Sequence, residues 1–554
     1  MTSNARSGGS LFLEILKDEG ISYLFGNPGT TELPIMDAFK DHKDLNYVLG
    51  LEESIVVAMA DGYSRASGKL SACNVHVAPG LGNAIGSIYN AKFTGTPMII
   101  TAGQQEQGHG LTEPLLYDPL IPIATPVVKW ATEVTRIEDL PLTLRRAAKI
   151  ATTPPTGPVF ISLPGDVLND VSAISIGKST RVETRTQPTS EVLDQMTDLL
   201  LSAKRPVIVA GDEVVKSSAL AEAAELADVL GAAAYQQSVP YGAHFLSEHP
   251  CYLGTLSRDQ RDVHEKLLPY DLMIVLGADP LRMSVYSETD PMPEHMKIVH
   301  LGLVDWDMGK NYAADLAVKS DIRSTLRSLL PVLKKRGGQA LEQRAQSLKI
   351  ALTTGNWTTN RNHLMASLEE LEITEPMAPD WVMMRITEAL PDNAVVVNEA
   401  LTSTRHLNTL RPYRDRYDYH AFASGGIGWA LPAAIGIQLA DLRRPVCAII
   451  GDGSAMFSIQ ALWTAAHLRL PITYIITNNA SYRILKQRLL SFHDNTHYLG
   501  MDFNDPPLDF KAIAEGMGVS AVRVTNQTEL MPALGEAFSN SGPNLIDVAV
   551  DGVV

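Results

Sequence analysis

The chain has 554 residues, of which 45% are hydrophobic and 19% are charged, a composition typical of a globular protein with several domains. Its 46 Lys and Arg residues are outnumbered by 62 Asp and Glu residues, and this net charge of −16 argues against nucleic acid or an anionic membrane as a partner. Three widely spaced cysteines, a polar N-terminal segment and no apolar run of membrane-spanning length predict a cytoplasmic protein without disulfides.

The first 180 residues alternate between the patterns of helices and strands. Segment 11–20 has the spacing of an amphipathic helix, and further helical patterns cover 52–67 and 80–91. Val- and Ile-rich strand patterns separate them, at 21–26, 45–50, 71–77 and 97–103 and, last, within 153–167. Strands that alternate with helices predict a parallel sheet with helices on both faces.

The polar segment 178–190 has the composition of a linker, and a second α/β unit follows it, ending in a basic helical stretch at about 325–350. Residues 352–379 are expected to form a surface connection. A third unit then repeats the strand and helix alternation of the first. We therefore predict an α/β fold of three doubly wound parallel-sheet domains, over residues 1–180, 190–345 and 375–554.

A motif in the third unit predicts an anion and cation site. A predicted strand ends in Gly451-Asp452-Gly453-Ser454, directly before a helix, and the backbone N–H groups of such a helix start can bind an anion. The next predicted strand ends at Asn479, at the same edge of a parallel sheet. The Asp452 carboxylate, the Asn479 amide oxygen and the Ser481 carbonyl would then supply oxygen ligands of the kind that Mg²⁺ prefers. A lone Gly-Asp-Gly is more often a simple turn, but the whole pattern is far more specific.

This motif resembles the diphosphate- and magnesium-binding motif of thiamine diphosphate (ThDP) enzymes, and further matches follow that family along the chain. The matching segments resemble the pyruvate-oxidase/decarboxylase group of 2-oxo acid decarboxylases and carboligases, most closely its benzoylformate decarboxylase type. They are FGNPGTTELP (25–34), GLEESIVVAMADGYSRASGK (50–69), NVHVAPGLGNA (74–84), TAGQQ (101–105), VKW (128–130), GGIGWALPAAIGIQLA (425–440) and GDGSAMFSIQALWTAA (451–466).

The resemblance implies a pyrimidine-binding, a middle and a diphosphate-binding domain in the ThDP-binding fold. It implies non-oxidative decarboxylation of a 2-oxo acid with ThDP and Mg²⁺ as cofactors, and carboligation of the resulting enamine to an aldehyde. The domain with residue 53 of one subunit is expected to face the domain with residue 452 of another. At least a homodimer is therefore implied, and commonly a homotetramer.

Glu53 is the candidate catalytic carboxylate. It lies at the start of a predicted helix, where a carboxylate could also be a mere favourable helix-terminal charge, as its neighbour Glu52 could be. By the resemblance, Glu53 hydrogen-bonds the aminopyrimidine ring of ThDP. Such a carboxyl shares a proton with the ring and so promotes loss of the thiazolium C2 proton.

His76 and Thr30 are the candidate substrate contacts in the first domain. His76 ends a predicted strand, at the carboxyl edge where ligands bind in open α/β sheets, although a lone His among apolar residues is more often structural. It matches the family's active-site histidine, which could protonate or orient the reacting group. Thr30 matches a serine that contacts the substrate carboxylate, with Thr31 as the alternative. A helix cap or turn is the other role for both threonines.

The resemblance assigns further residues to the cofactor and the substrate. Ile427 would wedge beneath ThDP and enforce its bent shape, although an isoleucine there is more often a core residue. Leu485 would pack near the pyrimidine or the substrate. The remaining cofactor-binding residues by this matching are Glu53, Gly425, Gly426, Gly451, Asp452, Gly453, Ser454, Asn479, Ser481 and Tyr482, of which Asp452, Asn479 and Ser481 would hold the metal.

The sequence also departs from the benzoylformate decarboxylase pattern. Ser284 stands in the middle domain where that type carries a second catalytic histidine, and Arg483, Ile484 and Arg488 replace smaller or aromatic residues around its phenyl pocket. Because of these changes, the sequence does not predict whether the substrate carries an aryl group. An acetolactate synthase-like or 2-hydroxyacyl-CoA lyase-like carboligase is the first alternative. A non-catalytic nucleotide-binding protein is the second alternative. Such a protein usually has a Gly-x-Gly-x-x-Gly motif after its first strand and an acidic residue about 20 positions further on, and this sequence has no such pattern.

Overall fold

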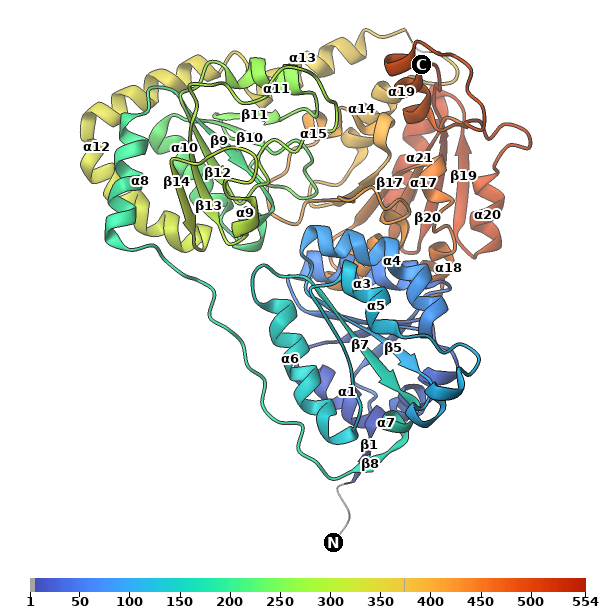
Figure 1. Cartoon of the computed structure of the whole chain (residues 1–554). Helices are drawn as coiled ribbons and strands as arrows, with labels where there is room; N and C mark the ends of the chain where they lie inside the picture. Colours follow the sequence, from blue (N-terminus) through green and yellow to red (C-terminus); the bar gives the residue numbers. More distant parts are fainter. Residues whose placement is uncertain (1–4, 373) are drawn as a thin grey trace.

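The computed structural model describes residues 5–372 and 374–554 of the chain. It contains three six-stranded parallel sheets, and Figure 1 shows that each is the centre of a separate lobe with helices packed around it. Each sheet is formed by one continuous stretch of chain, 23–164, 206–319 and 395–549. The predicted fold class of three doubly wound parallel-sheet domains is confirmed.

The first sheet has the strand order β3-β2-β4-β5-β7-β6. Its central strands are buried along their whole length, as the Val- and Ile-rich sequence predicts for strands covered on both faces. The elements are β1 (Arg6–Ser7), α1 (Gly8–Asp18), β2 (Tyr23–Gly26), η1 (Thr30–Glu32), α2 (Leu33–Ala38), η2 (Phe39–Asp41), β3 (Asn46–Leu49), α3 (Glu53–Ser67), β4 (Ser71–Val75), α4 (Val77–Thr94), β5 (Met98–Gln104), η3 (Gln107–Thr112), α5 (Leu120–Ala124), η4 (Thr125–Val127), β6 (Trp130–Glu133), η5 (Ile137–Asp139), α6 (Leu140–Thr152), β7 (Pro158–Pro164), α7 (Gly165–Asn169) and β8 (Val171–Ser172).

The second sheet has the order β11-β10-β9-β12-β13-β14. Its elements are α8 (Ser190–Ser202), β9 (Pro206–Ala210), α9 (Asp212–Lys216), α10 (Leu220–Leu230), β10 (Ala233–Gln236), β11 (Tyr252–Thr255), α11 (Gln260–Leu267), β12 (Leu272–Leu276), β13 (Lys297–Gly302), η6 (Asp305–Asp307), β14 (Leu316–Lys319) and α12 (Ile322–Leu352). The stretch 352–379, expected as a surface connection, instead contains α13 (Trp357–Glu369). The Trp357 side chain is buried, and its indole N–H donates to the Asn408 carbonyl at 2.8 Å, which ties this helix to the third domain.

The third sheet has the order β16-β15-β17-β18-β20-β19, so that β17 and β18, which carry the predicted cofactor motif, lie side by side in the centre. Its elements are α14 (Pro379–Ala389), β15 (Val395–Glu399), η7 (Leu401–Thr404), α15 (Leu407–Leu410), β16 (Tyr419–Ala421), α16 (Ala430–Ala440), β17 (Val446–Gly451), α17 (Asp452–Ala455), α18 (Ala461–His467), β18 (Ile472–Asn478), α19 (Arg483–His493), α20 (Phe510–Gly516), β19 (Ser520–Val524), α21 (Gln527–Ser539) and β20 (Asn544–Ala549).

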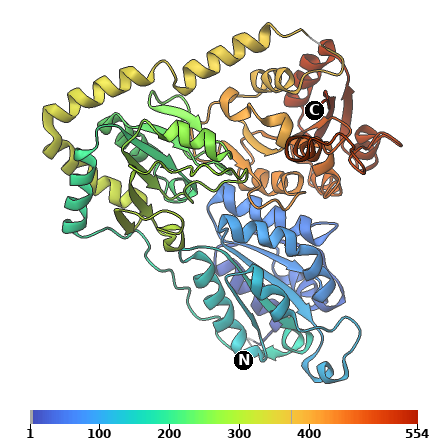
Figure 2. The ribbon, with the colours of Figure 1, turned by 45° about the horizontal axis from the view of Figure 1, so that its top comes forward.

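Helices α3 and α16 join the first and third domains, which lie against each other in both views of the molecule (Figures 1 and 2). Two glycines allow the close approach. A Cβ atom on Gly62 would lie 2.3 Å from the Ala433 carbonyl oxygen, and one on Gly436 would lie 1.9 Å from that of Met59. Apolar residues of both helices are buried in one continuous core.

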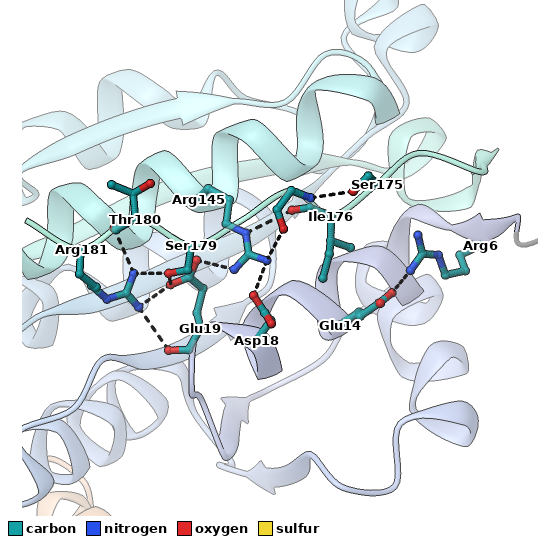
Figure 3. Close-up of polar contacts among 11 residues, drawn as sticks. Arg6, Glu14, Asp18, Glu19, Arg145, Ser175, Ile176, Ser179, Thr180 and Arg181 are labelled. Atoms are coloured by element: carbon teal, nitrogen blue, oxygen red, sulfur yellow. Dashed lines mark hydrogen bonds and ion pairs between the residues drawn. The ribbon is translucent and has the colours of Figure 1, made fainter.

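The predicted linker runs along the outside of the molecule from the first to the second domain (Figure 1). Ion pairs hold its start against the first domain, as Figure 3 shows. Arg145 of α6 contacts Asp18 at 2.5 Å and Glu19 at 2.6 Å, and Arg181 of the linker pairs with the same Glu19. Because Arg145 and Glu19 are mostly buried, these pairs fix the point at which the chain leaves the domain.

Cys73, Cys251 and Cys447 are all buried as free thiols, as their spacing predicts. Over residues 5–372 and 374–554, no helix has both the length and the apolar character needed to cross a bilayer.

Candidate active site

The first part of the site surrounds His76, which directly follows β4 and caps α4. Its imidazole Nδ1 donates to the Glu32 carboxylate at 2.7 Å, with the proton assigned from the carboxylate partner. Glu32 has no exposed surface, and it also accepts the backbone N–H groups of Gly29 at 2.9 Å and Gly103 at 2.8 Å. The imidazole is therefore held by one nitrogen, which leaves Nε2 available for another group.

The threonine beside His76 is Thr31. Its hydroxyl donates to Glu32 at 2.8 Å and lies 3.3 Å from His76 Nδ1, whereas the Thr30 side chain is exposed. Sequence reasoning chose Thr30 and left Thr31 as the alternative. The structure joins Thr31 to the histidine, and a substrate contact by Thr30 stays a prediction.

Glu53 and Glu52 differ clearly in their surroundings. Glu52 is the N-cap of α3, and its carboxylate accepts the backbone N–H of Ser54 at 2.8 Å, which is the structural role expected for it. Glu53 is buried instead and accepts the Asn83 amide N–H at 3.0 Å. A Cβ atom on Gly80 would lie 2.8 Å from the second carboxylate oxygen of Glu53. A larger residue at position 80 would therefore displace the Glu53 side chain.

The second part of the site lies at the carboxyl edge of the third sheet. Asp452 follows β17 and is buried, and its carboxylate accepts the backbone N–H groups of Gly453 at 2.8 Å and Asn479 at 3.1 Å. The Asn479 amide oxygen in turn accepts the Ser481 N–H and hydroxyl, each at 3.0 Å. The spacing of the sequence motif thus does bring Asp452, Asn479 and Ser481 together.

Burial raises the pKa of Asp452 to about 6, against the opposing effect of its backbone N–H partners. No Lys or Arg of the described chain forms an ion pair with this carboxylate. A divalent cation bound there would compensate the buried charge. Across the described residues no group of three His, Cys, Asp or Glu side chains could hold a metal, so any cation here depends on one carboxylate and neutral oxygens.

Ile427 lies in the loop between β16 and α16, and Glu399 organises this loop. The Glu399 carboxylate at the end of β15 is buried and accepts the backbone N–H groups of Gly428 and Ala430, both at 2.6 Å. Gly428 has a φ of +95°, a conformation that favours glycine. The Ile427 side chain is 38% exposed, so this apolar group projects from the surface next to Gly425 and Gly426.

Tyr482 and Leu485 lie at the start of α19, a few residues after Asn479 in the sequence. The Tyr482 ring packs edge to face on Phe503. It also lies against Gly453, where a Cβ atom would be 2.7 Å from a ring carbon of Tyr482. Leu485 is 47% exposed. Ser284 lies in an exposed loop of the middle domain, where its backbone N–H donates to the Arg258 carbonyl at 3.3 Å.

The site residues form two groups within one chain. Among the described residues, neither Glu53 nor His76 makes a hydrogen bond or an ion pair with any residue of the third domain. Sequence reasoning missed Glu32, Asn83 and Glu399. Glu32 lies within the Gly-Thr-Thr-Glu turn that the sequence singled out, so an acidic residue beside candidate substrate contacts was the available signal. For Glu399, the only available signal in the sequence was its position at the end of a predicted strand.

Known proteins are similar to this chain along nearly its whole length. Three models of thiamine pyrophosphate enzymes match the chain: the N-terminal TPP binding domain over residues 6–115, the central domain over 193–329 and the C-terminal TPP binding domain over 401–548. Benzoylformate decarboxylase of Pseudomonas aeruginosa is 33% identical over 97% of both chains. Acetolactate synthase isozyme 1 large subunit of Escherichia coli is 26% identical over 98% of this chain and 94% of its own length.

Solved structures give the same result. The ThDP-dependent 4-hydroxybenzoylformate decarboxylase of Rhodococcus jostii has a TM-score of 0.88 and 29% identity, with 99% of both chains covered. Benzoylformate decarboxylase of Polynucleobacter necessarius has a TM-score of 0.87 and 28% identity over the same share of both chains. The chain therefore belongs to the family of thiamine pyrophosphate enzymes, among its ThDP-dependent decarboxylases.

Proposed function

We propose that the protein catalyses the non-oxidative decarboxylation of a 2-oxo acid, with ThDP and Mg²⁺ as cofactors. The reaction takes up one proton and releases CO₂ and an aldehyde. The observation that carries the proposal is the presence of two complementary half-sites in one chain. One has the buried Glu53 bound to Asn83 and, in the same domain, His76 bound to Glu32. The other has the buried Asp452 beside Asn479.

The second half-site suits a diphosphate and its metal. Asp452, the Asn479 amide oxygen and the Ser481 carbonyl would supply protein ligands to Mg²⁺, which usually keeps waters and substrate oxygens as its other ligands. Gly453 and Ser454 would present backbone N–H groups to the diphosphate. When bound, ThDP supplies the carbon nucleophile and the electron sink that decarboxylation of a 2-oxo acid requires.

The first half-site suits proton handling. Glu53 has one carboxylate oxygen bound to Asn83, and its other oxygen is free to hold a proton at the pyrimidine ring. His76, oriented by Glu32, presents Nε2 to the substrate. It can hydrogen-bond the substrate carboxylate before CO₂ leaves and can deliver the proton that completes the aldehyde.

We further propose that two chains are needed for a complete site, as a homodimer at least and as a homotetramer in its full assembly. Apolar side chains near both half-sites support this. Leu111 and Leu115, after β5, are 96% and 84% exposed, and Phe457, after α17, is 55% exposed. Contact with a second chain would remove these apolar groups from water.

The test is a decarboxylation screen of the cofactor-loaded protein over aryl, aliphatic and dicarboxylic 2-oxo acids. CO₂ release and aldehyde formation in equal amounts are expected with at least one member. If none of them is decarboxylated although ThDP and Mg²⁺ bind, the proposed function is wrong.

Carboligation of the decarboxylated fragment to an acceptor aldehyde is a second candidate, favoured by the acetolactate synthase relatives and by Ser284. A serine at this middle-domain loop cannot donate a proton as an imidazole can. Product ratios with saturating acceptor aldehyde measure ligation against simple aldehyde release. Ser284→His is expected to shift this ratio toward aldehyde by roughly tenfold. An unchanged ratio would mean that Ser284 does not face the reacting atoms.

A further inference from the structure

A buried lysine lies close to the candidate metal ligands. Within α19, all of whose residues the structure describes, Lys486 is the only buried residue. Its ammonium group forms an ion pair with Asp502 at 2.5 Å and lies 5.3 Å from the centre of the Tyr498 ring. Lysine is almost never buried unless its charge is paired, so this ion pair accounts for the position of Lys486. Asp502 is the middle residue of a short segment, residues 501–503, which is named the pairing segment.

The pairing segment forms an antiparallel bridge with the chain just before α19, and Asp502 lies opposite Ser481. One backbone hydrogen bond on each side holds this pair together: the Phe503 N–H donates to the Ala480 carbonyl at 2.8 Å, and the Tyr482 N–H donates to the Met501 carbonyl at 2.9 Å. Because the bonds flank the pair, the N–H and C=O groups of Ser481 itself point away from the pairing segment.

The candidate metal ligands lie on the side to which these groups point. The Ser481 N–H donates to the Asn479 amide oxygen at 3.0 Å, and the Asn479 N–H donates to the Asp452 carboxylate at 3.1 Å. The Ser481 carbonyl faces the same way as its N–H, and it accepts no hydrogen bond from the part of the chain that the structure describes. The pairing segment therefore sets the direction of this carbonyl.

The turn between the two candidate ligands needs such support. Ala480 has a φ of +52°, a conformation that residues other than glycine rarely adopt. Its N–H donates to the Asn478 amide oxygen at 3.1 Å, and its carbonyl accepts the Phe503 N–H. The Phe503 ring also packs against Tyr482, with 4.5 Å between the ring centres. Contacts from the pairing segment thus hold the turn in a shape that the local sequence does not favour.

We propose that Lys486 and Asp502 are positioning residues for the metal site. Their ion pair holds the pairing segment in place, and this segment holds the Ser481 carbonyl and the Asn479 amide oxygen ready for Mg²⁺. The inference rests on the proposed function, which requires Mg²⁺ at Asp452. Ligands that are already in place bind a metal without the cost of ordering the chain. Loss of the contacts that orient metal ligands typically lowers metal affinity about 10- to 100-fold.

Calorimetric Mg²⁺ titration of the protein saturated with ThDP is the direct test. We expect Lys486→Met and Asp502→Asn each to raise the Kd for Mg²⁺ by about 10- to 100-fold. Asp502→Glu keeps the charge and should retain most of the affinity. Arg385→Met is the matched control, because Arg385 of α14 forms an ion pair with Glu369 at 2.5 Å in neither metal-binding segment. It should leave the Kd for Mg²⁺ unchanged.

Two further measurements separate positioning from a general loss of stability. Decarboxylation by Lys486→Met and Asp502→Asn should return at high Mg²⁺ concentration, with a kcat close to that of the wild type. Hydrogen exchange of the metal-free proteins, measured by mass spectrometry, should be faster within residues 480–503 of these two variants than in the wild type. Arg385→Met should leave exchange in this stretch unchanged.

The outcomes distinguish this inference from the proposed function. If the wild type binds no Mg²⁺ in the presence of ThDP, the proposed function is wrong and the positioning role is wrong with it. If the wild type binds Mg²⁺ and the Lys486 and Asp502 variants bind it equally well, only the positioning role is wrong. It is also wrong if Arg385→Met weakens Mg²⁺ binding to the same extent, or if high Mg²⁺ concentration does not restore the rate.

Discussion

The Glu32 carboxylate shows how a residue outside the reaction can prepare one inside it. It is fully buried, yet both of its oxygens accept hydrogen bonds, from Gly29, Thr31, His76 and Gly103. These partners come from separate segments of the first domain, and a carboxylate with several N–H donors is stable without water. The His76 ring orientation therefore depends on Glu32.

Glu32→Gln should slow decarboxylation of the substrate by up to about 10²-fold, because an amide cannot accept all of these hydrogen bonds and the imidazole loses its position. His76→Ala should slow the same reaction by roughly 10²–10⁴-fold. The decisive measurement is the turnover rate of the double variant. If Glu32 acts through His76, adding Glu32→Gln to His76→Ala should cause little further loss. Independent, multiplying losses would instead give Glu32 a role of its own.

Glu53→Gln should leave the fold and ThDP binding intact and lower the rate by about 10²–10⁴-fold, because the pyrimidine ring loses the carboxyl that shares its proton. NMR of hydrogen–deuterium exchange at C2 of bound ThDP measures this step directly. Glu52→Gln is the matched control, since its carboxylate only caps α3 and its loss should cost about 1 kcal/mol of stability. Slow exchange in the Glu52 variant and normal exchange in the Glu53 variant would reverse the assignment.

At the scale of elements, the α3 and α16 crossing depends on glycines that admit no side chain. Gly436→Ala would place a methyl group into the backbone of α3, and overpacking of this kind costs about 1–3 kcal/mol or more. Gly535→Ala in α21 is the control, because its Cβ would meet no atom within 4 Å, and it should stabilise the protein slightly. Denaturant midpoints of the two variants should move in opposite directions. Equal midpoints would mean that the helices can separate without cost.

The loop that carries Ile427 should respond to pH through Glu399. Burial raises the pKa of this carboxyl to about 7, and the groups that face it are the backbone N–H groups of Gly428, Trp429 and Ala430. Because the folded-state pKa lies above the unfolded value, the protonated form stabilises the fold at low pH, and this contribution is lost as the pH rises toward 7. The free energy of unfolding of the wild type, relative to Glu399→Gln, should fall by about 2–3 kcal/mol from pH 5 to pH 8. A pH-independent difference would contradict the raised pKa.

At the scale of the whole molecule, the sequence predicts the order of helices and strands and the ends of strands well. It predicts less well which residues bind each other by hydrogen bonds. The alternation of Val- and Ile-rich strands with amphipathic helices is local, so the three sheets and the meeting of Asp452 with Asn479 could be predicted. The Glu32 to Gly103 and Glu399 to Gly428 contacts join residues far apart in sequence. In both contacts the donor is a backbone N–H group, which every residue but proline carries. A pattern of residue types therefore cannot predict these contacts. Similarly, α13 forms where a polar composition predicted a connection, because Trp357 is buried in the core of the middle domain and its indole N–H donates to Asn408 of the third.

The last prediction concerns the division of the site between two chains. Glu53→Gln and Asp452→Ala should each be nearly inactive alone, the first for lack of the proton-sharing carboxyl and the second because cofactor retention loses its only charged ligand. If each active site uses Glu53 of one chain and Asp452 of the other, a mixed dimer of the two variants has one site with both native residues and one with neither. Random reassociation of equal amounts should then restore about a quarter of the wild-type activity.

Calorimetric ThDP and Mg²⁺ titration of the same mixture adds a readout that does not depend on turnover. The Asp452→Ala protein alone should bind no cofactor, and the mixture should bind it in proportion to its Glu53→Gln chains, which keep Asp452. The control is a mixture of Glu53→Gln with His76→Ala, two residues of the same half-site. In that mixture every site carries one of the two substitutions, so activity should not return. No recovery in the first mixture would place Glu53 and Asp452 in the same chain's site. Recovery in the control would mean that Glu53 and His76 reach one site from different chains.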